Sequence, residues 1–154
     1  MKLTTKLATA VVVLVMAWST NAQQTTNDGN EKRVALNEVA VAHDGDGVAA
    51  LQGTLRTTAL AGSPDSPVTN IRMIIKNTSG ISYAFVSGVV TFYDSAGIRC
   101  GEGIFKADAV AMDESFESDT PGVRIRCEAT TWRIVATNLL PRVPPTPPTP
   151  VRQP

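Results

Sequence analysis

The side chains that could carry out chemistry are few, and several of them surround the single histidine. His43 is followed by Asp44 and Asp46 in the segment HDGDG. Two carboxylates beside an imidazole could bind a divalent cation, or the imidazole could serve as the base of a hydrolase. An EF-hand loop starting at Asp44 fails, because Val48 and Leu55 occupy its fifth and twelfth positions, where oxygen ligands are required. The Asp-Gly pairs favour a turn, since glycine adopts positive φ without steric cost.

The serines and the other carboxylates give no stronger indication of catalysis. No serine lies in a nucleophile-elbow pattern. A second acidic group is explained by a solvated acidic strand; its members are Asp113, Glu114, Glu117 and Asp119. We therefore predict no catalytic residue and no cofactor, and we retain Asp44 and Asp46 only as weak candidates for metal ligands.

The chain contains two cysteines, Cys100 and Cys127. An even number in an oxidising compartment favours one intramolecular disulfide, with two buried free thiols as the alternative. The bond would close a ring of about 28 residues and stabilise the fold by about 3.6 kcal/mol. Two cysteines and one histidine are too few for a dedicated zinc site, which needs at least three protein ligands.

The N-terminus predicts export. Two lysines precede the apolar run LATAVVVLVMAW at 7–18, and small residues follow it up to Ala22. This order is typical of a signal peptide, and the run is shorter than the roughly 20 residues of a membrane span. We expect a signal peptide at 1–22, cleavage before Gln23, a disordered polar leader at 23–33, and a periplasmic or extracellular bacterial location.

The net charge of the exported chain limits the classes of partner that it could bind. The full chain has 14 basic and 14 acidic residues, and the signal peptide holds two of the lysines, so 12 basic and 14 acidic residues remain, a net charge of −2. Without a basic block, nucleic-acid binding has no electrostatic basis. No later apolar run is long enough to span a membrane. The remaining length suits one domain with tails.

The segment between 34 and 140 has the pattern of an all-β domain. Apolar and polar residues alternate in short runs that are separated by turn signals, and no long helix is indicated. The expected strands are 48–61, 68–77, 83–94, 98–106, 113–119, 123–128 and 130–137. Residues 34–42 are ambiguous, and 107–112 form a connection. We predict an Ig-like antiparallel β-sandwich of about seven strands.

The segment VSGVVTFYDSAGIRC predicts the hairpin at the centre of this domain. Its first strand is apolar on both faces, so it should be central in a sheet or have its outer face covered. Phe92 belongs to the core, and Tyr93 lies on the opposite face. Asp94 is suited to cap backbone N–H groups, and Gly97 to close the turn. Gly88 marks a bulge or a close neighbour.

From residue 141 the composition changes to a proline-rich tail, with seven prolines in the fourteen residues 141–154. Proline fixes φ and removes a backbone donor, so we expect an extended polyproline II segment of about 43 Å that joins no sheet. PxxP spacings would also suit SH3-type recognition, and a solvated spacer is the alternative that we favour.

Three short segments carry a resemblance to a known family. They are NTSG at 77–80, VTFYD at 90–94 with a glycine after it, and MDESF at 112–116. They resemble the small bacterial exported Ig-like domains named for a Phe-x-Leu-Tyr-Asp (FxLYD) signature. Val90 and Phe92 depart from the signature, and the Pro-Gly pair of the third segment is absent. The resemblance implies an Ig-like or fibronectin-III-like sandwich and transfers no catalytic residue.

Together these observations predict a non-enzymatic, exported envelope module with a binding or structural role. Its partner would be a protein or a glycan, and the module would be a monomer or a weak oligomer. Two alternatives stay open. One is a divalent-cation-binding module that uses Asp44 and Asp46 or the acidic group at 113–119, and the other is a hydrolase that uses His43.

Overall fold

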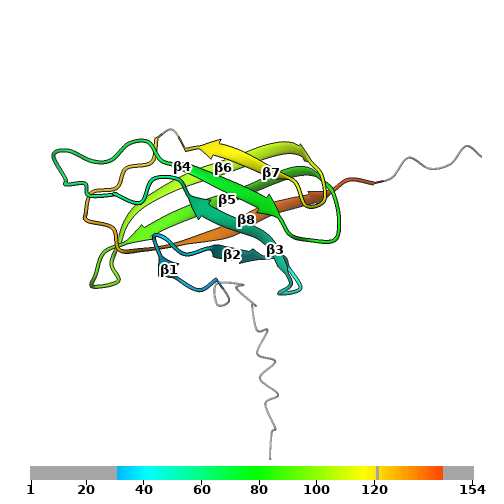
Figure 1. The fold of residues 1–154 in the computed structure, drawn as a ribbon, viewed down its shortest axis with the longest axis horizontal. Coiled ribbons are helices and arrows are strands. Elements are labelled where there is room, and N and C mark those ends of the chain that lie inside the picture. Colours follow the sequence, from blue (N-terminus) through cyan, green and yellow to red (C-terminus); the bar gives the residue numbers. More distant parts are fainter. Residues whose placement is uncertain (1–30, 121, 144–154) are drawn as a thin grey trace, which may run out of the picture.

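The computed structural model describes residues 31–120 and 122–143, which form two antiparallel four-stranded sheets packed face to face (Figure 1). The predicted signal peptide, its cleavage site between Ala22 and Gln23, the leader up to residue 30 and the tail from residue 144 lie outside the described residues. The β-sandwich prediction is confirmed. Within the described ranges no helix is long and apolar enough to cross a membrane.

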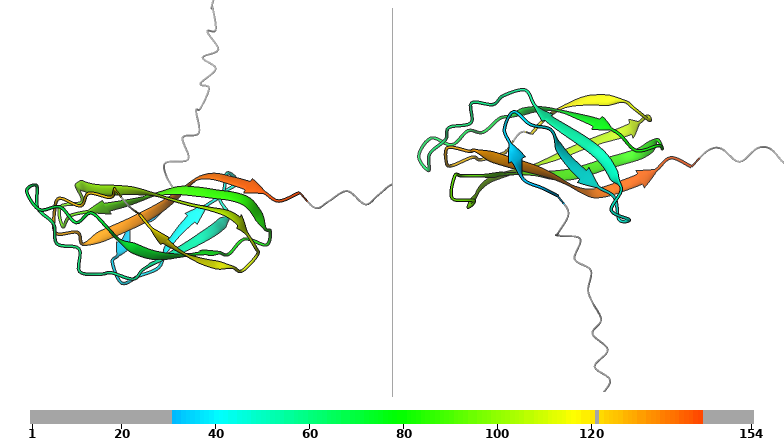
Figure 2. Two further views of the ribbon diagram at one scale, coloured as in Figure 1. Left: turned by 90° about the horizontal axis from the view of Figure 1, so that it is seen from above. Right: turned by 60° about the horizontal axis from the view of Figure 1, so that its bottom comes forward.

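Each sheet joins strands from different parts of the chain. The first sheet has the order β1 (Val34–Ala35), β8 (Thr131–Pro141), β5 (Tyr83–Tyr93) and β6 (Arg99–Val110). The second has the order β2 (Ala40–His43), β3 (Ala49–Leu55), β4 (Arg72–Asn77) and β7 (Ser115–Asp119). Figure 2 shows the two layers, with the short β1 in blue beside the beginning of β8 in orange.

Alternating polarity explains how the strands face the core. In β4, Met73 and Ile75 are buried, while Arg72 and Lys76 are exposed. The same period of two places the larger side chains of β3 and β8 between the sheets. As expected, β5 lies centrally, between β8 and β6.

Trp132 and Phe92 occupy the middle of the core. Both are fully buried, and their rings are stacked with centroids 6.5 Å apart. The indole N–H of Trp132 donates a hydrogen bond of 3.1 Å to the carbonyl of Ala35 in β1. On the opposite sheet, a Cβ added at Gly53 would lie 3.1 Å from the Trp132 ring. Trp132 thus contacts both sheets.

One expected strand is absent. Residues 123–128 form only isolated bridges, Val68↔Ile125 and Ala61↔Glu128. The alternation there correctly predicts burial, because Val123 and Ile125 are buried. It does not produce a ladder, since the segment crosses from β7 to β8 and its backbone reaches β6 through the hydrogen bond from Arg126 N–H to the carbonyl of Cys100 (3.0 Å).

Several strand ends also differ from the expectation: β3 ends at Leu55 and not at Ala61, and β4 begins at Arg72 and not at Val68. Strand β6 continues to Val110, through the segment predicted as a connection, because β5 is long enough for Tyr83 to pair with Val110. Strand β8 includes Pro141, the first residue of the predicted tail, paired with Tyr83. A proline can end a strand in this way because it lacks the donor but keeps the carbonyl acceptor.

Candidate functional site

The turn between β2 and β3 fixes His43, Asp44 and Asp46. One carboxylate oxygen of Asp44 accepts hydrogen bonds from the N–H groups of Asp46 (3.0 Å) and Val48 (2.9 Å). Gly47 follows with φ of 79°, the left-handed region that glycine adopts without steric cost. This geometry agrees with the interpretation of HDGDG as a turn.

The β5–β6 turn has the same construction. Asp94 accepts hydrogen bonds from the N–H groups of Ala96 (3.0 Å) and Ile98 (2.8 Å), and Gly97 has φ of 77°. Both hairpins also have a register shift just before the aspartate. Asp94 and Gly97 therefore have the turn roles expected from the sequence, and the shared Asp-x-x-Gly pattern makes Asp44 a turn residue too.

The outer side of the β5–β6 hairpin is covered by an arginine. Tyr93 is only 4% exposed, and the guanidinium carbon of Arg33 lies 4.0 Å from the centroid of its ring. The Arg33 guanidinium also donates to the carbonyl of Gly97 (3.1 Å). Phe92 points into the core, as predicted, so this pair of aromatic residues serves the fold.

The two cysteines lie at disulfide distance, with Cα atoms 5.9 Å apart, and are joined in the structure. The bond connects β6 to the crossover segment that replaces the expected strand. This agrees with the disulfide interpretation and not with two free thiols. It lies on the opposite edge of the first sheet from β1, since β6 is the last strand in that sheet.

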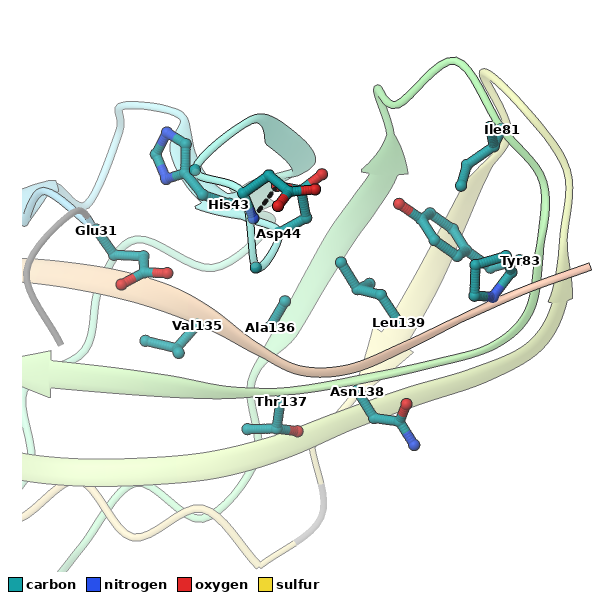
Figure 3. Close-up of a pocket in the computed structure, with 14 residues that line it drawn as sticks. Glu31, His43, Asp44, Ile81, Tyr83, Val135, Ala136, Thr137, Asn138 and Leu139 are labelled. Carbon is teal, nitrogen blue, oxygen red and sulfur yellow. Dashed lines mark hydrogen bonds between the residues drawn. The ribbon is translucent and has the colours of Figure 1, made fainter. Parts of the chain in front are cut away.

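A cleft of about 770 Å³ opens between the β2–β3 turn and the C-terminal half of β8 (Figure 3). The turn contributes His43, Asp44 and Asp46, and Glu31 enters from the segment before β1. The other side chains come mainly from β8 and from the start of β5; they are Ile81, Tyr83, Val135, Ala136, Thr137, Asn138, Leu139 and Pro141. The volume is in the range of small-ligand and peptide sites.

The charge of the cleft is one-sided. Glu31, Asp44 and Asp46 line it, and no lysine or arginine is among the described residues that do so. Val135 and Leu139 add apolar surface on the facing strand. Such a surface is suited to a ligand that carries positive charge beside apolar groups.

Two polar atoms at the cleft have no partner in the described part of the chain. The Oε2 atom of Glu31 and the Nδ1 atom of His43 are buried without a hydrogen bond. Buried polar groups are normally hydrogen-bonded, so these two atoms indicate a place for a ligand or for water. Tyr83, which is only 2% exposed, points its hydroxyl toward the turn that carries Asp44 (Figure 3).

Among the described residues, the cleft places no serine or cysteine nucleophile beside His43. No serine or cysteine is among its described lining residues, and the Thr137 hydroxyl is hydrogen-bonded to that of Ser87 (3.1 Å). In the described ranges, no group of three or more histidine, cysteine, aspartate or glutamate side chains could hold a metal ion. Asp44 and Asp46 share a turn, and the remaining acidic group lies elsewhere, on and before β7.

Strand β8 contributes its open backbone edge to this site. β1 pairs only with Thr131 and Trp132, so within the described residues no strand is hydrogen-bonded to β8 from Arg133 onward on the side away from β5. The cleft-lining residues of β8 all fall within this unpaired part. The site therefore combines an acidic turn with a free strand edge.

The comparisons with known proteins found no match: no family model, no curated protein and no solved structure is similar to this chain. The resemblance to FxLYD domains stays a prediction.

The sequence pointed to the turn but not to the other half of the site. His43, Asp44 and Asp46 stood out as a cluster, whereas Tyr83 and Asn138 did not. Tyr83 begins an apolar strand and Asn138 follows an ordinary one. Tyr83 lies on the central strand β5 and Asn138 on the neighbouring β8, and only the packing of the two sheets brings them to the same cleft as the turn.

Proposed function

We propose that this protein is a non-enzymatic, exported envelope module that binds a partner through the cleft beside β8. The observation that carries the proposal is the coincidence of an open strand edge with buried, unpartnered polar groups in one cleft. An exposed sheet edge and unsatisfied polar groups are both costly without a partner. The disulfide-linked β-sandwich is compatible with export, and the FxLYD-type resemblance supports an Ig-like domain of this kind.

A protein or glycan partner fits this site better than a substrate to be cleaved. Hydrolysis through a covalent intermediate with a histidine base needs a nucleophilic side chain within hydrogen-bond reach of that base. The described residues at the cleft offer His43 without a serine or cysteine beside it. A cation-binding module is the weaker alternative, because one oxygen of Asp44 already accepts two backbone hydrogen bonds.

Substitution of His43 distinguishes a binding module from a hydrolase. We expect His43→Ala to have the same turnover as the wild type on a panel of ester, amide and glycoside substrates, because a binding module has no activity that depends on the imidazole. A hydrolytic activity that is present in the wild type and lost in His43→Ala would replace the binding proposal. Asp46→Asn with calcium calorimetry tests the cation alternative, for which we expect a flat titration.

A further inference from the structure

The open edge of β8 is long and carries little protection. β1 covers its first two residues, and in the described structure no strand is hydrogen-bonded to that side of β8 from Arg133 to Pro141, although β2 of the other sheet lies close to β8. Sheet proteins usually blunt such an edge with charges, prolines or a bulge. Here the only charged residue of that part is Arg133, the only proline is the last residue, and the pairing with β5 has two register shifts, one near Thr137 and one at Leu140–Pro141.

The surroundings of the edge are matched to a strand rather than to a compact ligand. The cleft follows β8 from Val135 to Pro141, so it extends along the strand direction. An extended peptide added to an exposed edge gains main-chain hydrogen bonds, and its alternate side chains enter the flanking pockets. β1 lies at the N-terminal end of the β8 edge, where it already pairs with β8 in an antiparallel manner.

The negative charge of the cleft favours basic side chains in such a peptide. Glu31, Asp44 and Asp46 present carboxylates on the side of the cleft that faces β8, and no basic residue neutralises them within its described lining. The buried Oε2 atom of Glu31 is an acceptor without a partner in the described structure. Lysine and arginine are the side chains whose donors would satisfy this acceptor.

We propose that the edge of β8 from Arg133 to Pro141 is an acceptor for an extended basic peptide segment of a partner protein, which would add a strand in line with β1 and place lysine or arginine side chains against Glu31 and Asp46. This inference rests on the proposed binding function and gives it a partner class. The competing occupant is the chain's own segment 23–30, which precedes the cleft in sequence.

The test uses the chain that begins at Gln23 and a short acetylated peptide in which lysine and threonine alternate with valine. We expect saturable binding by fluorescence anisotropy, and slower amide hydrogen exchange confined to residues 133–141. The same peptide N-methylated at alternate residues cannot form the strand ladder and should bind at least roughly tenfold more weakly. Equal binding of both peptides would overturn strand addition while leaving a binding cleft, so the proposed function would survive.

The charge requirement is tested on the protein. The double variant Glu31→Gln/Asp46→Asn should weaken binding of the lysine peptide about fivefold and reduce its salt dependence. Asp65→Asn, in the exposed loop between β3 and β4, is the matched control and should bind as the wild type does. A glutamate-for-lysine peptide that binds as tightly as the lysine peptide would overturn the charge argument.

A truncation separates the partner from the chain's own leader. If the chain that begins at Glu31 binds the peptide and the chain that begins at Gln23 does not, the leader occupies the edge and the partner proposal is overturned. Equal binding by both chains supports a partner. Failure of every peptide, together with no retention on a glycan array, would overturn the proposed function as well as this inference.

Discussion

At the scale of single residues, Asn77 connects three parts of the chain. It is fully buried at the end of β4. Its amide nitrogen donates to the carbonyls of Ile81 (2.8 Å) and Ala111 (2.9 Å), and its oxygen accepts from the N–H (3.1 Å) and the hydroxyl (2.7 Å) of Ser79. One side chain therefore holds the crossover from β4 to β5 against the connection between β6 and β7.

We predict that Asn77→Ala lowers the free energy of unfolding by about 2 kcal/mol, because it removes the two hydrogen bonds that this fully buried amide donates to the carbonyls of Ile81 and Ala111. Urea denaturation followed by circular dichroism measures the change. Asn70→Ala removes an exposed side chain of the same type and should change stability by less than about 0.5 kcal/mol. Equal effects of the two substitutions would show that the network does not hold the crossover.

Gly88 is a position where the residue type alone predicted the local structure. A Cβ at this position would lie 2.2 Å from the Phe105 ring and 2.5 Å from the carbonyl oxygen of Val135. A register shift between β5 and β8 also falls at this residue. The sequence predicted a bulge or a close neighbour here, and both are present, because a glycine inside an otherwise apolar strand has few other reasons to be there.

At the scale of elements, the disulfide fixes the segment that was expected to form a strand and does not. The crossover segment after β7 carries buried Val123 and Ile125 but pairs with its neighbours only at isolated bridges. It packs against Gly101 of β6, where an added Cβ would come within 2.8 Å of Ile125. The Cys100–Cys127 bond holds this segment to β6 without a ladder.

We predict that the double variant Cys100→Ser/Cys127→Ser loses about 3.6 kcal/mol of unfolding free energy, the chain-entropy value for a closed ring of this size. Urea denaturation of the wild type with and without a reductant should show the same difference. Intact mass after alkylation without reduction is the check on the bond itself. Alkylation of both thiols in the native, unreduced protein would contradict the bond and the predicted loss together.

The elements also show which parts of the fold a sequence can predict. Alternation predicted the buried faces of β3, β4 and β8 correctly, and the two Asp-x-x-Gly turns marked their hairpins, because both signals act within a few residues. Alternation reports burial and not pairing, so it wrongly made a strand of 123–128. The length of β6 was set by its partner β5, which no local pattern encodes.

At the scale of the whole molecule, the candidate site follows from where one short strand begins. Because β1 is antiparallel to β8, residues before Val34 would have to join β1 for the cleft-lining edge of β8 to be paired. The sequence there is polar and without periodicity, and residues 23–33 were predicted to be a leader and not a strand. The acidic turn was predictable from HDGDG, whereas its position opposite Tyr83 and Asn138 depends on the packing of the two sheets.

The two sheets share one core, and the fluorescence of Trp132 can be used to follow its unfolding. In the chain that begins at Gln23 it is the only tryptophan, since the other is Trp18. It is fully buried, stacks on Phe92 of its own sheet and approaches Gly53 of the other. Separation of the sheets would therefore expose the indole to water, whichever sheet unfolded first.

We predict that Trp132 fluorescence and far-ultraviolet circular dichroism give coincident urea transitions, as expected for a single cooperative unit of this size with its disulfide intact. Gly53→Ala places a methyl group 3.1 Å from both the Trp132 ring and the Ile134 side chain. It should lower stability by about 1 kcal/mol and shift both transitions equally. A fluorescence transition at lower urea than the dichroism transition would show that the sheets part before they unfold, and the cleft between the β2–β3 turn and β8 would then open independently of the core.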